Sequence, residues 1–239
     1  MLNKPMSVAW CRTPRPGNFG DILTPFILSY YGYDVTWAGP ESADYYCVGS
    51  IAKWARTGTT VLGSGAMTSA ARLDPAANWR WVQGPRTRSI VIKNGGDCPE
   101  TYGDPAMLLP RIVTATDNKK YSVGIVPHYV NYQEVKDSFP DLPVINLLNS
   151  DPTEVIKEIT ACEKIISSSP HGIIAAHAYG IPAAWVKFSD RLAGDDTKFY
   201  DHFESMETSA ILSTVYNPVY AFVNFDDSVI HEILKSGNF

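Results

Sequence analysis

The chain has 239 residues, with 20 lysines and arginines against 25 aspartates and glutamates, so its formal net charge is −5 and its pI is about 5.5. Hydrophobic residues make up 45% and charged residues 19%, which is enough apolar surface for a packed core and excludes an intrinsically disordered chain. The acidic balance argues against a general nucleic-acid-binding protein, which would carry a basic surface. The length suits one large domain or two small ones.

The cysteines and the apolar runs indicate in which cellular compartment the protein resides. Cys11, Cys47, Cys98 and Cys162 form no close pair, so the sequence indicates neither a zinc site nor a disulfide framework, and we expect reduced, mostly buried thiols. No apolar run reaches the roughly 18 residues of a spanning helix, and the start of the chain lacks the apolar stretch of a secretory signal. We therefore expect a cytoplasmic protein.

In the first part of the chain, short apolar runs alternate with helix-like segments, which is typical of parallel α/β structure. We expect one amphipathic helix at residues 21–31, with Asp21 as its N-cap and Gly32 as its stop. The expected strands lie at residues 7–10, 35–37, 45–48, 59–62 and 79–82.

The polar stretch at residues 114–120 is a predicted linker, after which the alternation restarts. The expected strands are residues 122–126, 144–146, 164–167 and 183–186, and the expected helices are residues 132–139, 151–162, 171–179 and 226–235. The sequence thus predicts two α/β halves, residues 1–116 and 117–239. Because ligands bind beyond the carboxyl ends of parallel strands, we expect the site in the cleft between the halves.

The strongest signal for chemistry is the serine-rich turn at residues 167–172, between an expected strand and an apolar helix. Helix N-termini hold anions because they expose unpaired N–H groups and the positive end of the dipole. Ser168 and Ser169 add hydroxyl donors, Gly172 lets a ligand approach the backbone, and His171 can transfer a proton near neutral pH. The alternative is that the serines only cap the helix and His171 is a surface histidine.

Three loops of the first half carry further candidates. Asn18 and Asp21 lie in a glycine-bounded turn and could bind hydroxyl groups, unless Asp21 serves only as a cap. Arg86 follows Gly84-Pro85, and its planar guanidinium could bind a carboxylate or phosphate through two hydrogen bonds, unless it is simply solvated. Asp104 caps an apolar segment or fixes a loop at the cleft.

Three residues of the second half complete the set. His128 follows the expected strand 122–126, so it stands at the carboxyl end of that strand. Lys198, in a polar and aromatic patch, could reach an anionic group. His177 lies on another helical face than His171, and we expect it in the core. The histidine spacings match no metal motif, so no metal is expected.

Together, these loops resemble the polysaccharide pyruvyltransferase family. The resemblance runs from about residue 7 to residue 205, and the ordered set is specific although no single motif is. It rests on NFGD at 18–21, the glycines at 63 and 65, GPRT at 84–87, GDPA at 103–106, GIVPHY at 124–129, the segment 167–182, and KF-x-D at 198–201. The chain looks most similar to the bacterial exopolysaccharide branch, of the succinoglycan-pyruvylating type.

The resemblance implies a fold and a reaction. Members of the family resemble GT-B glycosyltransferases, with two Rossmann-like halves around a cleft. They transfer a pyruvyl group from phosphoenolpyruvate to two hydroxyls of one sugar, which forms a cyclic ketal and releases phosphate. The resemblance therefore implies an enzyme of exopolysaccharide biosynthesis that uses phosphoenolpyruvate as co-substrate and no other cofactor. The C-terminal half would bind the donor, and the N-terminal half would bind a lipid-linked or nucleotide-linked sugar at the inner membrane face.

The family's Ser/Arg-x-His-Gly motif carries onto Ser169, His171 and Gly172. We assign the proton transfers to His171, with Asp21 as the second catalytic candidate. The expected donor-binding residues are Ser168, Ser169, Gly172, Arg86, Lys198 and His128, and the expected acceptor-binding residues are Asn18 and Asp104.

One residue departs from the family pattern. Pro170 stands where the family usually has leucine or a similar apolar residue, and a proline lacks the N–H that could bind phosphate. Two alternative functions stay open. The first is a nucleotide-sugar-dependent glycosyltransferase of the same fold. The second is a non-catalytic carbohydrate-binding relative, which Pro170 favours.

Overall fold

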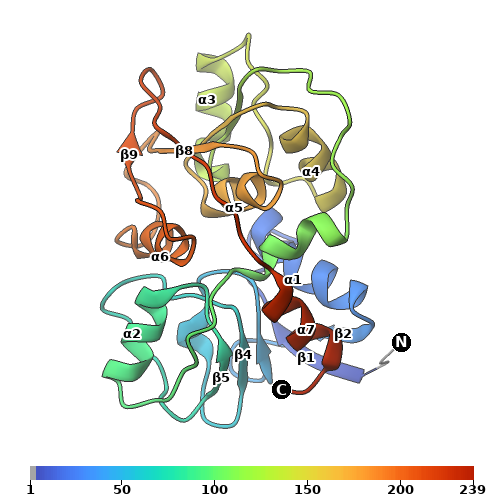
Figure 1. Cartoon of the computed structure of the whole chain (residues 1–239), viewed down its shortest axis with the longest axis vertical. Coiled ribbons are helices and arrows are strands. Elements are labelled where there is room, and N and C mark those ends of the chain that lie inside the picture. The colour runs from blue at the N-terminus through green and yellow to red at the C-terminus, as the bar shows by residue number, and fades with distance from the viewer. Residues whose placement is uncertain (1–3) are drawn as a thin grey trace.

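A computed structural model of the protein describes residues 4–239, so the first three residues of the expected N-terminal half lie outside the described part. The chain forms two lobes, each built around one β-sheet and stacked along the long axis (Figure 1). The predicted α/β class with parallel sheets is confirmed. The domain boundaries at residues 116 and 117 stay a prediction.

The first lobe contains a five-stranded sheet whose neighbouring strands are all parallel. Its order is β2 (Tyr33–Trp37), β1 (Lys4–Ala9), β3 (Tyr45–Tyr46), β4 (Thr60–Leu62) and β5 (Asn78–Trp81). Successive side chains point to opposite faces of a strand. Val61 and Leu62, which are successive, accordingly pack into two different cores on opposite faces. Trp79 and Trp81 also reach different cores although they are two residues apart, because the pairing of β4 with β5 shifts register between Val61 and Leu62. Both faces of this sheet are therefore covered, as parallel sheets require.

The second lobe contains a five-stranded, mixed sheet. Its order is β10 (Tyr220–Ala221), β8 (Ala183–Val186), β7 (Ile165–Ser167) and β6 (Gly124–Val126), and β9 (Leu212–Ser213) pairs with the end of β8. Strands β6, β7 and β8 are parallel to one another, whereas β10 is antiparallel to β8. The carboxyl ends of β6 and β7 lead into the loops that carry His128 and His171.

Helices cover the sheets and join the lobes. The helices are α1 (Phe19–Tyr30), α2 (Pro85–Lys93), α3 (Tyr132–Ser138), α4 (Pro152–Thr160), α5 (Pro170–Ala178), α6 (Thr197–Ser205) and α7 (Ser228–Ser236), with 3₁₀ turns η1 (Ala52–Trp54), η2 (Pro105–Arg111) and η3 (Tyr129–Asn131). One hydrophobic core continues through both lobes, because it includes Phe19 of α1, Leu108 of η2 and Ile173 of α5. This shared core fixes the loops of one lobe against those of the other.

The last helix returns to the first lobe. Helix α7 lies beside β1 and β2 in Figure 1. Tyr33 of β2 donates a hydrogen bond to the carbonyl of Leu234, and Lys4 of β1 donates one to the carbonyl of Gly237. Arg111 forms two hydrogen bonds with Asp227 just before the helix. Residues at the end of the sequence thus pack on the sheet formed by its beginning.

The structure corrects three details of the expected elements. Asn18, not Asp21, is the N-cap of α1, since its Oδ1 accepts the N–H of Gly20, and Asp21 is the third residue of the helix. The expected strand at 144–146 is an isolated bridge between Val144 and Ile125, because the pairing does not extend further. Helix α6 was not expected as a helix, although Phe199 and Phe203, four residues apart and both buried, are the signal for it.

Across residues 4–239, the longest apolar helices are too short to cross a bilayer. His177 is in the core, as predicted: it is buried, and its Nδ1 lies 2.9 Å from Nε2 of the buried His202.

Candidate active site

A pocket of about 310 Å³ lies between the two lobes. Both lobes contribute loops to it, and it brings together six of the predicted site residues. These are Asn18, Asp21, His128, Ser169, His171 and Lys198. The volume is at the lower end of the roughly 300–1,000 Å³ of small-molecule sites.

A larger open groove of about 820 Å³ lies along the outer side of α1. It is lined mainly by apolar and aromatic side chains, such as Trp10, Phe26 and Tyr30. None of the residues assigned to catalysis or substrate binding lines this groove. The smaller pocket, with its titratable groups, is therefore the candidate active site.

The turn between β7 and α5 forms one wall of the pocket. The Ser167 hydroxyl donates to the carbonyl of Val126 and accepts from the N–H of Ser169, so it closes the turn. Ser169 is the N-cap of α5, but its side chain makes no capping hydrogen bond. Pro170 occupies the first helical position, where its missing N–H costs least. The hydroxyl of Ser169 does not cap α5, and Ser169 and Pro170 both line the pocket.

His171 is held between the lobes. Gly20, in the first turn of α1, leaves room for the imidazole, because a Cβ at position 20 would overlap Nδ1 of His171. On the other side, Nε2 of His171 lies 3.4 Å from Oδ2 of Asp104. The side chain of His171 is only 13% exposed. The NFGD motif and the serine-rich turn therefore meet at this ring.

Asp104 lies behind His171 and not in the pocket. Its side chain is fully buried, and its Oδ1 accepts the N–H of Ala106 at 2.9 Å as the cap of η2. Its Oδ2 and the Nε2 of His171 have no other hydrogen-bond partner within residues 4–239. We had expected Asp104 to bind the acceptor sugar. It does not line the pocket and instead faces the imidazole of His171.

Asp21 lines the pocket, and Asn18 holds its carboxylate in place through two hydrogen bonds. Its Oδ2 accepts from the backbone N–H of Asn18 at 3.1 Å and from its side-chain amide at 2.6 Å. Burial raises the pKa of Asp21 to about 6, although the Asn18 hydrogen bond and the nearby His171 oppose this shift. A carboxyl with such a pKa can exchange a proton near neutral pH.

Two basic residues of the second lobe face the same pocket. Burial, together with charge repulsion from Lys198 and His171, lowers the pKa of His128 to about 4. His128 is therefore a neutral imidazole at pH 7. Lys198 is only 6% exposed, its Nζ donates to the carbonyl of Ala193 at 3.0 Å, and burial lowers its pKa. A bound anion would offset this cost, since an opposite charge stabilises the ammonium.

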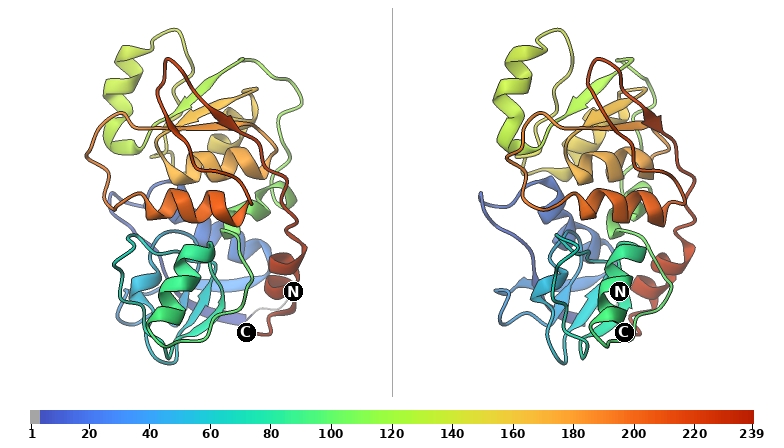
Figure 2. Two further views of the ribbon diagram at one scale, coloured as in Figure 1. Left: turned by 60° about the vertical axis from the view of Figure 1, so that its left-hand side comes forward. Right: turned by 90° about the vertical axis from the view of Figure 1, so that its left-hand side faces the viewer.

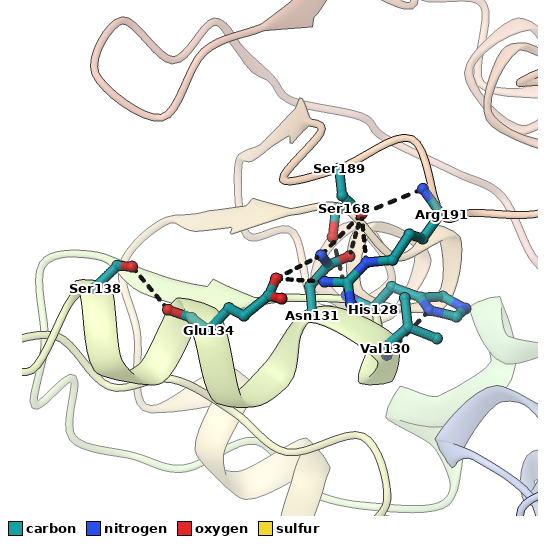
Figure 3. A network of polar contacts seen from close by, with 8 residues as sticks. All are labelled: His128, Val130, Asn131, Glu134, Ser138, Ser168, Ser189 and Arg191. Atoms are coloured by element: carbon teal, nitrogen blue, oxygen red, sulfur yellow. Dashed lines mark hydrogen bonds and ion pairs between the residues drawn. The ribbon is translucent and has the colours of Figure 1, made fainter.

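Arg191 is a cation at the pocket that sequence reasoning missed. Figure 3 shows its guanidinium beside Glu134 of α3 and Ser189. Asn131 is buried and donates to the hydroxyl of Ser189 at 2.9 Å, which anchors the loop after β8. The signal that could have found Arg191 is its place in a loop at the carboxyl end of a parallel strand. Lys53 also lines the pocket.

Three predicted donor-binding residues do not line the pocket. Arg86 donates from Nε and Nη2 to Glu204 and stacks 4.3 Å above the ring of Tyr200. Ser168 is buried, and its hydroxyl accepts the N–H of His128 at 2.9 Å, so it supports that loop. Gly172 is buried and packs against β7, since a Cβ there would lie 2.5 Å from the hydroxyl of Ser167.

The fold and the pocket define an α/β protein whose interlobe site combines a helix N-terminus, basic side chains and a buried Asp–His pair. Residues 84–190 match the model of the polysaccharide pyruvyl transferase family, which supports this family for the chain. The match includes His171 and Asp104 but neither Asp21 nor Lys198.

One relative is an uncharacterized protein of Acanthamoeba polyphaga mimivirus, 33% identical over 164 residues. The alignment covers 65% of this chain and 57% of that protein, so the chain spans well under two thirds of the relative's length. No solved structure matches the chain.

Proposed function

We propose that the protein transfers a pyruvyl group from phosphoenolpyruvate to two hydroxyls of one sugar, which forms a cyclic ketal and releases phosphate. The observation that carries this proposal is the interlobe pocket, where His171, Asp21 and Lys198 converge at the start of α5. The two mostly parallel sheets that face this pocket support a GT-B-like arrangement of Rossmann-like lobes. The second lobe then supplies the donor site and the first lobe the acceptor site.

Donor binding needs converging positive groups, because phosphoenolpyruvate carries a phosphate and a carboxylate. The start of α5 offers N–H groups that have no acceptor within the helix, and its dipole favours an anion. Ser169 and neutral His128 offer hydrogen bonds beside it, while Lys198 and Arg191 supply charge. Arg191 replaces Arg86 as the arginine of this site, because Arg191 lines the pocket and Arg86 does not.

Two groups, His171 and Asp21, transfer the protons in this proposal. His171 carries the proton for the donor, and the buried Asp104 orients its ring and stabilises the protonated imidazole, as a carboxylate does in a Ser-His-Asp site. Asp21, with its pKa near 6, accepts the proton of a sugar hydroxyl. Asn18 holds Asp21 and borders the acceptor.

The reaction balances without a further reagent. A proton adds to the methylene carbon of phosphoenolpyruvate, and the neighbouring carbon becomes electrophilic. The oxygen of one hydroxyl bonds to that carbon and loses its proton, the carbon–oxygen bond to phosphate breaks, and the second hydroxyl then closes the ring. Of the two protons released by the hydroxyls, one replaces the proton given to the methylene carbon and the other leaves with phosphate.

The acceptor is a sugar of an exopolysaccharide or its precursor, and we propose the succinoglycan-pyruvylating type as the relevant branch. A lipid-linked acceptor would bring this cytoplasmic enzyme to the inner membrane face. Pro170 leaves the remaining N–H groups of α5 to bind the donor. Nothing in the reaction requires a cofactor besides phosphoenolpyruvate.

The test is to incubate the protein with phosphoenolpyruvate and a panel of galactosides and glucosides, and to follow phosphate release together with pyruvate gain on the sugar by mass spectrometry. We expect both signals in equal amounts. His171→Ala should lower turnover by at least about 10²-fold, whereas His231→Ala, on α7 outside the pocket, should not. Tight UDP or GDP binding without phosphate release would indicate a glycosyltransferase, and glycan binding without turnover would indicate a non-catalytic protein; either result rejects the proposal.

A further inference from the structure

Helix α2 of the first lobe is capped by a residue of the second lobe. Its own N-cap, Gly84, has no side chain. Oδ1 of Asp201, on α6, accepts the backbone N–H groups of Arg86 at 2.8 Å and Thr87 at 3.1 Å, and its Oδ2 accepts the Thr87 hydroxyl at 2.6 Å. Asp201 thus does for α2 what a capping aspartate normally does within one segment.

The GPRT motif is built around this contact. A Cβ on Gly84 would overlap the backbone carbonyl of Asp201, so only glycine lets the two helices approach. The Thr87 hydroxyl also accepts the N–H of Ala66 at 2.8 Å. Ala66 directly precedes Met67, which lines the pocket. The Asp201–Thr87 contact is therefore linked to the pocket through the first lobe, in addition to its link through α6.

Asp201 shares a face of α6 with the pocket lysine. Lys198, Asp201 and Glu204 are spaced three residues apart and so form one stripe along the helix. Lys198 enters the pocket, Asp201 caps α2, and Glu204 pairs with Arg86. Figure 2 shows α6 lying across the lobe boundary directly against α2. Asp201 is buried, whereas the Arg86–Glu204 pair is about 40% exposed and screened by water.

We propose that Asp201 is a positioning residue that fixes Lys198 in the donor site by tying α6 to the N-terminus of α2. This inference rests on the proposed function for the role of Lys198, but the tie itself does not. The GPRT motif then joins the two lobes. The N-terminus of α2, which could otherwise bind an anion, already binds the carboxylate of Asp201.

The experiment compares Asp201→Asn with Glu204→Gln, one turn away, in the full chain. Acetylation of lysine amines is followed by mass spectrometry, with exposed Lys157 as the internal reference, and the KM for phosphoenolpyruvate is measured in parallel. We expect Asp201→Asn to raise the acetylation rate of Lys198 at least about fivefold, and to raise the donor KM about tenfold with kcat within threefold. Glu204→Gln should change neither quantity more than twofold.

Thr87→Val and Thr87→Ser provide a second pair if Asp201→Asn does not fold. The valine removes the hydroxyl that donates to Asp201 and should expose Lys198, whereas the serine keeps the hydroxyl and should behave like the wild type. Unchanged acetylation of Lys198 in Asp201→Asn and Thr87→Val, or an equal rise in Glu204→Gln, overturns the inference. A wild-type protein that releases no phosphate rejects the proposed function instead, and the acetylation rates still decide the positioning role.

Discussion

Oδ2 of Asp104 and Nε2 of His171 face each other at 3.4 Å, and neither has another hydrogen-bond partner within residues 4–239. Asp104 caps η2, whereas His171 opens α5, so the pair exists only because these two elements pack together in the shared core. A buried carboxylate that faces an imidazole fixes the orientation of the ring.

Asp104→Asn tests this relationship, because it keeps the shape of the side chain and removes its charge. We expect kcat for phosphate release to fall by about 10²–10⁴-fold, the contribution of a positioned proton carrier, while the donor KM changes less than threefold. Asp151→Asn, at the exposed cap of α4, serves as the control. Wild-type turnover in Asp104→Asn would show that the imidazole does not depend on this carboxylate.

Gly20→Ala should disable the site without a change in its charges. The new Cβ would overlap Nδ1 of His171, so the ring must leave its place beside Asp104. We expect phosphate release to fall at least about 10²-fold, the same scale as the loss of the proton carrier. Gly39→Ala is the matched control, since its nearest neighbour would be the Ser42 hydroxyl at 3.7 Å. Equal activity of the two variants would contradict the packing role of Gly20.

The pH dependence of kcat/KM should show the ionisation of Asp21 as a rising limb on its acidic side. Its pKa is raised to about 6 by burial, so the carboxylate that accepts a proton is populated only above that pH. We expect kcat/KM to rise tenfold per pH unit below about 6 and to level off above it, because kcat/KM reports the groups of the free enzyme. Asp21→Asn should abolish this limb together with most of the activity. A limb that persists in Asp21→Asn belongs to another group.

The same shift fixes the sign of a stability effect. Because the pKa of Asp21 is higher in the folded protein than its ordinary value of 3.8, burial penalises the carboxylate. This group's contribution to the free energy of unfolding is therefore most favourable below pH 4 and falls as pH rises toward 6. Wild type and Asp21→Asn should differ in the slope of Tm against pH between 4 and 6, and parallel slopes would argue against the raised pKa.

Lys198→Met and Arg86→Ala should separate the two cations that the sequence treated alike. Lys198 faces the pocket, and the loss of one charge-assisted hydrogen bond of about 1.5–3 kcal/mol should raise the donor KM by at least about tenfold. Arg86 pairs with Glu204 outside the pocket, so Arg86→Ala should leave the donor KM within twofold of the wild type. Initial rates over a range of phosphoenolpyruvate concentrations give both values, and a larger effect at Arg86 would reverse the assignment.

The sequence by itself determined the local features of this protein. Alternation of apolar runs predicted the parallel strands, Asp151 before Pro152 predicted the start of α4, and the turn before His171 was recognisable because helix ends and turns depend on neighbouring residues. The tertiary structure alone decided which groups meet. Asp104 faces His171, Asp201 caps α2 and Arg191 enters the pocket because packing joins segments distant in sequence, and no local pattern encodes such distances.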